Sequence, residues 1–183
     1  MKKLSKIFCF LLLLFITLPI YGKDIKDMYV QRTGAEGSLF FIFKQDLPAL
    51  KNTEKIAKKI SYDYTYLEQT DSVAMLMTLH LPVVIKNIEM TVAYNNSHYS
   101  DAAELIYVAA KGNKFEYRLR FMMPFHVFEK MYATDTPFVI KIQGNSDGKE
   151  SAYEFGYNSK KWINARKNLS TIINIIRLNT HKE

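Results

Sequence analysis

Polar and apolar residues alternate along most of the chain after residue 28, as in β-strands whose two faces meet different surroundings. In residues 61–67, for example, Tyr62, Tyr64 and Tyr66 fall on one face, while Asp63 and Thr65 fall on the other. Comparable runs predict strands over 28–32, 38–44, 73–81, 85–94, 104–110, 114–122, 138–143 and 151–157. Short turns rich in glycine and asparagine separate several of these runs and favour antiparallel hairpins.

Two later segments change to the three- and four-residue spacing of amphipathic helices. Pro124 suits the first turn of a short helix over 124–132, because its missing N–H costs nothing there. A C-terminal helix is predicted over 159–178, with an apolar side formed by Trp162, Ala165, Leu169, Ile172, Ile173 and Ile176. A further short surface helix is predicted over 53–59, where a threonine precedes an acidic residue and two late lysines.

These elements predict an α+β, β-rich fold, since about nine strands are mostly joined by turns and the main helices come late. An antiparallel β-sandwich is the leading architecture, with the helices near 124–132 and over 159–178 packed on it. A single curved sheet wrapped against the C-terminal helix is the alternative.

The first 22 residues predict a signal peptide that is removed on export. Lys2, Lys3 and Lys6 precede an apolar run over 7–16, which is shorter than the ~20 residues of a membrane-spanning helix. Cys9, the only cysteine, lies in this run, so residues 23–183 contain no disulfide or thiol. We expect 23–183 to form a single β-rich domain without a membrane span, periplasmic in a bacterium or secreted from it.

The net charge adds little to this description. Lys2, Lys3 and Lys6 account for three of the 25 basic residues, which leaves 22 basic against 18 acidic residues, or +4, after the signal peptide. The remaining charges are interspersed rather than gathered in a basic stripe, so we expect no nucleic-acid partner.

No residues are assigned to catalysis, to a metal or to another cofactor. The histidines, His80, His98, His126 and His181, lie at no spacing typical of metal ligands, and no cysteine pair accompanies them. There is also no glycine-rich phosphate loop. Carboxylates scattered over several strands leave an unrecognised hydrolase as one alternative function.

The aromatic content, 12 Tyr and 12 Phe, is the most informative feature for binding. Tyr62, Tyr64 and Tyr66 share one strand face and could stack on sugar rings or contact a peptide. His98 and Tyr99, in a polar loop predicted over 95–101, complete the candidate ligand-binding residues. The alternative interpretation is that the three tyrosines line the interior between the two sheets.

The leading functional hypothesis is a non-catalytic exported binding or accessory domain, whose ligand is a glycan or a cell-envelope protein. Methionines concentrated in the middle of the chain suggest an alternative, a carrier of an apolar ligand or lipid in a Met- and Phe-lined cavity. An exposed row of tyrosines would favour the surface binder, an enclosed cavity the carrier, and two carboxylates facing across a cleft the hydrolase. No pattern in the sequence bears on the oligomeric state.

Overall fold

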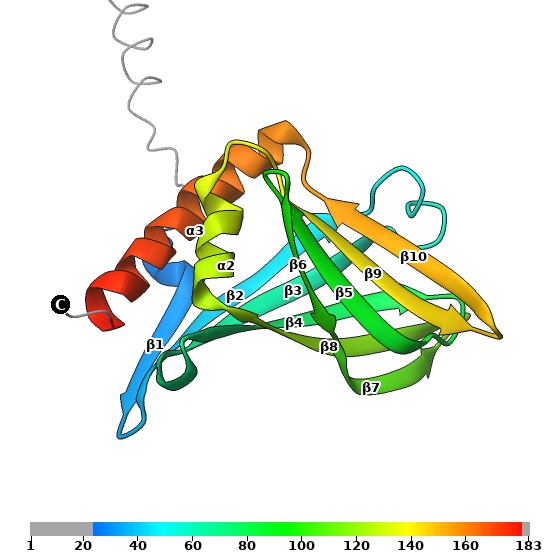
Figure 1. Ribbon diagram of the computed structural model, residues 1–183, viewed down its shortest axis with the longest axis horizontal. Coiled ribbons are helices and arrows are strands. Elements are labelled where there is room, and N and C mark those ends of the chain that lie inside the picture. Colours follow the sequence, from blue (N-terminus) through cyan, green and yellow to red (C-terminus); the bar gives the residue numbers. More distant parts are fainter. Residues whose placement is uncertain (1–23, 181–183) are drawn as a thin grey trace, which may run out of the picture.

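Two stacked antiparallel sheets make up most of the structure, a computed structural model that describes residues 24–180 (Figure 1). The larger, sheet A, has the strand order β1 (Tyr29–Gly34), β2 (Gly37–Pro48), β3 (Lys59–Leu67), β4 (Ser72–Leu81), β8 (Lys114–Pro124), β7 (Glu104–Lys111). The smaller, sheet B, has the order β10 (Lys149–Gly156), β9 (Val139–Ser146), β5 (Lys86–Tyr94), β6 (Ser97–Ala102). The predicted antiparallel β-sandwich with late helices is therefore confirmed.

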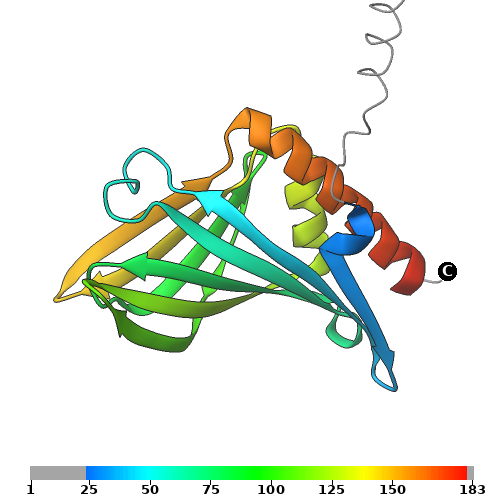
Figure 2. The same cartoon turned by 180° about the vertical axis from the view of Figure 1, so that it is seen from behind.

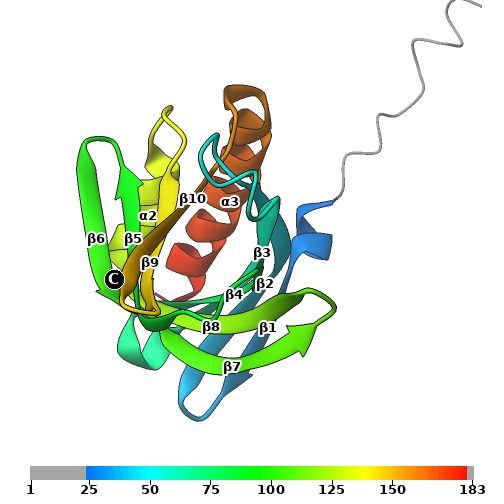
Figure 3. The same cartoon turned by 90° about the vertical axis from the view of Figure 1, so that its right-hand side faces the viewer.

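The two helices lie together at one end of the sheets, α2 at Phe125–Ala133 and α3 at Ser159–Thr180 (Figures 1 and 2). In Figure 3, turned by 90° from Figure 1, α3 appears between sheet B and the strands β2 and β3 of sheet A. The buried Trp162 ring stacks on Tyr132 of α2, with 5.5 Å between ring centroids. The Asn158 side chain accepts the Lys161 N–H and begins α3, as capping predicts. Both predicted helices are confirmed, with ends within two residues.

The predicted helix over 53–59 is wrong, and a series of turns takes its place. The Thr53 hydroxyl does not cap a helix but accepts the N–H of Glu154 in β10, at 2.7 Å. The neighbouring Leu50 N–H donates to the Glu154 carbonyl at 2.9 Å. These two bonds tie the segment to the end of β10, so a tertiary contact overrides the local preference for a helix.

The polar loop predicted over 95–101 is also wrong, because most of it forms strand β6. Asn95 and Asn96 both have positive φ, 42° and 61°, and make a tight turn from β5 directly into β6. This extra strand is why the structure has ten strands where the sequence predicted about nine.

The two long sides of the sandwich differ. On one side an isolated bridge pairs Ala49, just after β2, with Phe155 of β10, and so joins the sheets. On the other side one continuous stretch of chain forms β6 in sheet B, turns at Ala103 and forms β7 in sheet A. The Ala103 N–H donates to the Ile88 carbonyl of β5 at 2.9 Å. Beyond this bond β5 pairs with β9 and β6 in sheet B, whereas β7 pairs with β8 in sheet A.

The predicted signal peptide over 1–22 lies outside the described residues. Within 24–180 no helix is both long enough and apolar enough to cross a membrane.

Candidate functional site

The three tyrosines proposed as an exposed binding platform lie in the core. Tyr62, Tyr64 and Tyr66 are each at most 1% exposed, so they form no exposed platform. The alternative interpretation is right that they are interior, but the rings of Tyr64 and Tyr66 pack against helix α2 rather than against sheet B. Their strand face is covered by the helices, and the Tyr64 ring contacts Phe128 of α2 with centroids 4.7 Å apart. The alternation along β3 identified the shared face but not which side of the sheet the helices cover.

Hydrogen bonds between pairs of hydroxyl groups satisfy the polar atoms of these buried tyrosines. The Tyr62 and Tyr157 hydroxyls are 2.6 Å apart, and those of Tyr64 and Tyr132 are 3.0 Å apart. Burial raises the pKa of Tyr62, Tyr64 and Tyr132 well above that of an exposed tyrosine. The cluster is therefore a neutral, hydrogen-bonded part of the core, and its rings are unavailable to a ligand at the surface.

His98 and Tyr99, the other candidate residues, are not brought together. They are neighbours in β6, so their side chains point to opposite faces of sheet B. His98 is exposed, whereas the Tyr99 ring packs inward against Phe121 of β8, with centroids 5.7 Å apart. Asp101 lies on the same face as Tyr99, whose hydroxyl is 3.5 Å from its carboxylate, so Asp101 does not pair with His98. Whether either residue binds a ligand stays a prediction.

One segment resembles a catalytic motif that the sequence analysis overlooked. Residues 144–148, Gly-Asn-Ser-Asp-Gly, fit the Gly-x-Ser-x-Gly pattern, and Ser146 with Lys149 fits Ser-x-x-Lys. A nucleophile elbow lies on a strand-to-helix turn, whereas this segment is the hairpin between β9 and β10. Asp147 and Gly148 have φ of 48° and 76°, which a type I′ hairpin turn requires. The match therefore reflects turn composition.

A polar cluster on the outer face of sheet A is the nearest approach to acid–base chemistry. The Glu116 carboxylate accepts hydrogen bonds from Lys111 and Tyr107 and lies 2.9 Å from His80 Nε2. These bonds, that of Lys111 above all, lower the pKa of Glu116 to about 2, so it is a weak general base at neutral pH. Within residues 24–180 no group of three or more His, Cys, Asp or Glu could hold a metal ion.

Strand β7 forms an exposed, apolar edge of sheet A. It is the last strand of sheet A and, in the part of the chain that the structure describes, pairs with β8 alone. All eight of its residues are exposed, including four large apolar side chains in succession: Leu105 (43%), Ile106 (46%), Tyr107 (43%) and Val108 (38%). An exposed, apolar edge strand is a template for pairing with another polypeptide.

The pairing of β7 with β8 shows which of these side chains face inward. Leu105 lies opposite Leu119, and Val108 lies opposite Tyr117; both partners are fully buried. Leu105 and Val108 therefore belong to the inner face of sheet A, where apolar residues are normally covered. They stay exposed because the space between them and the start of β5 is open rather than filled by packed side chains.

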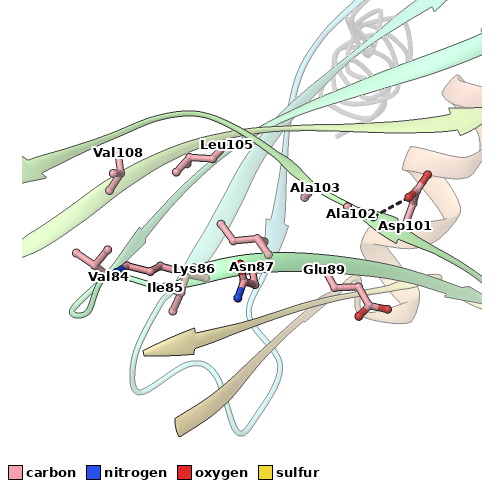
Figure 4. Close-up of a pocket in the computed structure, with 11 residues that line it drawn as sticks. Val84, Ile85, Lys86, Asn87, Glu89, Asp101, Ala102, Ala103, Leu105 and Val108 are labelled. Carbon is pink, nitrogen blue, oxygen red and sulfur yellow. Dashed lines mark hydrogen bonds between the residues drawn. The ribbon is translucent and has the colours of Figure 1, made fainter. Parts of the chain in front are cut away.

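An open groove of about 730 Å³ lies beside these residues, between β7 and the start of β5 (Figure 4). Leu105 and Val108 line one side, and Val84 lies across from them. Ile85 and Ile88 are buried and form apolar lining at the base of the groove. The charged residues of the lining carry both signs: Lys86, Glu89 and Asp101.

Two residues outside the groove fix its β5 side. The buried Tyr117 hydroxyl accepts the Ile85 N–H at 2.7 Å and donates to the Val83 carbonyl at 3.0 Å. Gly144 of β9 allows the chain to pass close by, because a Cβ there would lie 3.1 Å from both the Ile85 Cβ and the Lys86 carbonyl oxygen. The groove is therefore a built part of the fold rather than the gap beside a loose loop.

The edge of β7 and the groove beside it suit an extended polypeptide better than an acyl chain. The edge of β7 that pairs with no other strand among residues 24–180 needs hydrogen-bond donors and acceptors at the spacing of a strand, which a polypeptide supplies and an acyl chain does not. The groove is open rather than enclosed, unlike the cavity expected of a carrier. Glu89 and Asp101 do not face each other across it, because Glu89 lies in register with Ala102 and Asp101 with Met90, on alternate faces of sheet B.

Sequence reasoning treated 104–110 as an ordinary strand and missed this site. One local signal was present: four successive large apolar residues, Leu105 to Val108, break the alternation seen in β3 and β8. The decisive information is the strand order, since an edge position depends on which strands pair with β7. Comparisons of the chain with protein-family models, with curated proteins and with solved structures found no match.

Proposed function

We propose that this chain is an exported, non-catalytic binding domain that captures an extended, apolar segment of a cell-envelope protein. The segment adds as a strand to the free edge of β7 and places alternate side chains in the groove beside it. The observation that carries the proposal is the combination at β7 of an unpaired strand edge with inward-facing but uncovered apolar side chains.

Both halves of that combination argue for a polypeptide. Main-chain hydrogen bonds to the strand edge supply affinity without regard to sequence, and the groove selects apolar side chains at alternate positions. A glycan would require exposed aromatic faces, and the tyrosines proposed for that purpose are buried. The mixed charges of Lys86, Glu89 and Asp101 suit the polar residues that flank an apolar peptide segment.

The proposal can be tested with short linear peptides selected by phage display against the protein. We expect the selected sequences to carry apolar residues at alternating positions. Their dissociation constants are then measured with two variants of the same strand, Val108→Lys on the inner face and Ala109→Lys on the outer face. Ala109 lies opposite Glu116, which accommodates the new cation, so this variant is a matched control.

We expect Val108→Lys to weaken peptide binding by about tenfold or more, because a bound side chain would desolvate the lysine. Ala109→Lys should change the affinity by less than about twofold. Failure to enrich any peptide, or equal affinities of the two variants, would overturn the proposal. Binding of lauric acid that is sensitive to Val108→Lys, without peptide binding, would replace it by the carrier of an apolar ligand.

A further inference from the structure

The pairing of β7 with β8 contains one bulge, and the residues of β7 on its two sides are arranged symmetrically about Val108. The register runs from Glu104 opposite Arg120 to Lys111 opposite Lys114, but it skips Ile106, which is a bulge. Without Ile106, β7 is a regular strand of seven residues, Glu104, Leu105, Tyr107, Val108, Ala109, Ala110 and Lys111. Its middle residue is Val108.

A second copy of this strand can pair with the first about a two-fold axis through Val108. In that antiparallel arrangement Leu105 lies opposite Ala110 of the second copy, and Tyr107 lies opposite its Ala109. Each pair joins residues of the same sheet face, inner with inner and outer with outer, as an antiparallel ladder requires. Each pair also sets a large side chain against a small one, which lets the side chains interdigitate.

The charges at the two ends match in the same register. Glu104 lies opposite Lys111 of the second copy, and by symmetry Lys111 lies opposite its Glu104. Within one copy Glu104 already pairs with Arg120, and Lys111 pairs with Glu116. Each new contact therefore joins an acidic to a basic side chain on the outer face of sheet A, and no like charges oppose each other between the two copies.

We propose that the strand that fits the free edge of β7 best is β7 of a second copy, so that the chain forms an antiparallel, two-fold symmetric dimer with a continuous sheet across it. In Figures 1 and 3, β7 lies at the outer margin of sheet A. The dimer rests on the strand-accepting edge of the proposed function, and it covers that edge until a segment of the envelope partner displaces the second copy.

Cross-linking tests the register directly. The two Val108 residues of the pair would lie at the Cα separation of opposed antiparallel residues, about 4.5–5.5 Å, which a disulfide can bridge. In a Cys9→Ser background, which leaves no other cysteine, we expect Val108→Cys to form a disulfide-linked dimer under mild oxidation. Tyr107→Cys mixed with Ala109→Cys should cross-link faster than either alone, and Ala93→Cys, exposed on β5, is the control for random collision.

Charge reversal tests the pairing without cysteine. In a dimer of Glu104→Lys, the new lysine at each end lies opposite Lys111 of the other copy. In a dimer of Lys111→Glu, the new glutamate at each end lies opposite Glu104 of the other copy. Because both variants place like charges opposite each other, each alone should dimerise about tenfold more weakly or worse. Mixed together, the two variants restore both opposite-charge pairs, and we expect a heterodimer by sedimentation equilibrium. Neither variant removes an apolar core residue, so each should keep the melting temperature of a folded domain.

The proposal is overturned if the unaltered chain sediments as a monomer up to submillimolar concentration, or if Val108→Cys cross-links no faster than Ala93→Cys. Peptide binding to the Glu104→Lys monomer separates the two ideas. If that monomer binds selected peptides while no dimer forms, the edge accepts a strand from another protein and only the dimer is excluded.

Discussion

The hydroxyl of Tyr117 provides a quantitative test of how the groove is held. Replacing Tyr117 by Phe removes one oxygen and leaves the ring in place between its neighbours. The Ile85 N–H, which donates to this hydroxyl at 2.7 Å, would then be buried without a partner. An orphaned buried donor costs about 1–3 kcal/mol, whereas water can replace the hydroxyl at the carbonyl of Val83, an exposed residue.

We therefore expect Tyr117→Phe to lower the free energy of unfolding by about 2 kcal/mol. For a chain of this size that corresponds to a decrease of about 4–8 °C in the melting temperature. Urea denaturation followed by the fluorescence of Trp162, the single tryptophan, measures the change. Tyr107→Phe, which removes an exposed hydroxyl bonded to Glu116, is the control and should cost less than about 0.5 kcal/mol. Equal losses in the two variants would refute the role assigned to Tyr117.

Three further outcomes follow from the packing. Gly144→Ala should destabilise the protein by about 1–3 kcal/mol in urea denaturation because its Cβ would collide with the start of β5, whereas Gly34→Ala, with nothing within 4 Å, should be nearly neutral. Trp162→Ala should cost about 3–5 kcal/mol by thermal denaturation; Trp162→Phe should cost clearly less, because the indole N–H has no hydrogen-bond partner among the described residues. Burial raises the pKa of Tyr62 and Tyr132, so the folded state holds these protons more tightly than the unfolded state does. Stability should thus persist below pH ~10 and fall above it, and a spectrophotometric titration should show these tyrosines ionising only as the protein unfolds.

Much of the fold could be predicted from the local pattern of apolar residues. A strand or helix with one buried face repeats its apolar residues with the period of that element, so the period identifies the element. The alternation in 61–67 predicted β3 (Lys59–Leu67), and the apolar side from Trp162 to Ile176 predicted α3. The errors lie where a distant contact decides the local conformation. Thr53 bonds to Glu154, about a hundred residues along the chain, and 95–101 becomes a strand because β5 offers it an edge.

The candidate site could not be predicted in the same way. Period two places Tyr62, Tyr64 and Tyr66 on one face, but the helices that cover this face come much later in the chain. Leu105 and Val108 lie on the inner face once the bulge at Ile106 is taken into account, and they are exposed because an open groove separates them from the start of β5. Both outcomes depend on strand order and layer packing, which adjacent residues do not encode.

Amide hydrogen exchange at β7 tests the central claim most directly. The measurement compares the Glu104→Lys variant alone and with a selected peptide, since we expect this variant to keep the strand edge free of a second copy. In the free protein the amides of 104–111 that face away from β8 should exchange rapidly, and peptide binding should slow their exchange and that of the facing residues 84–89. Unchanged exchange in β7, with protection appearing on another face of the molecule, would contradict the claim.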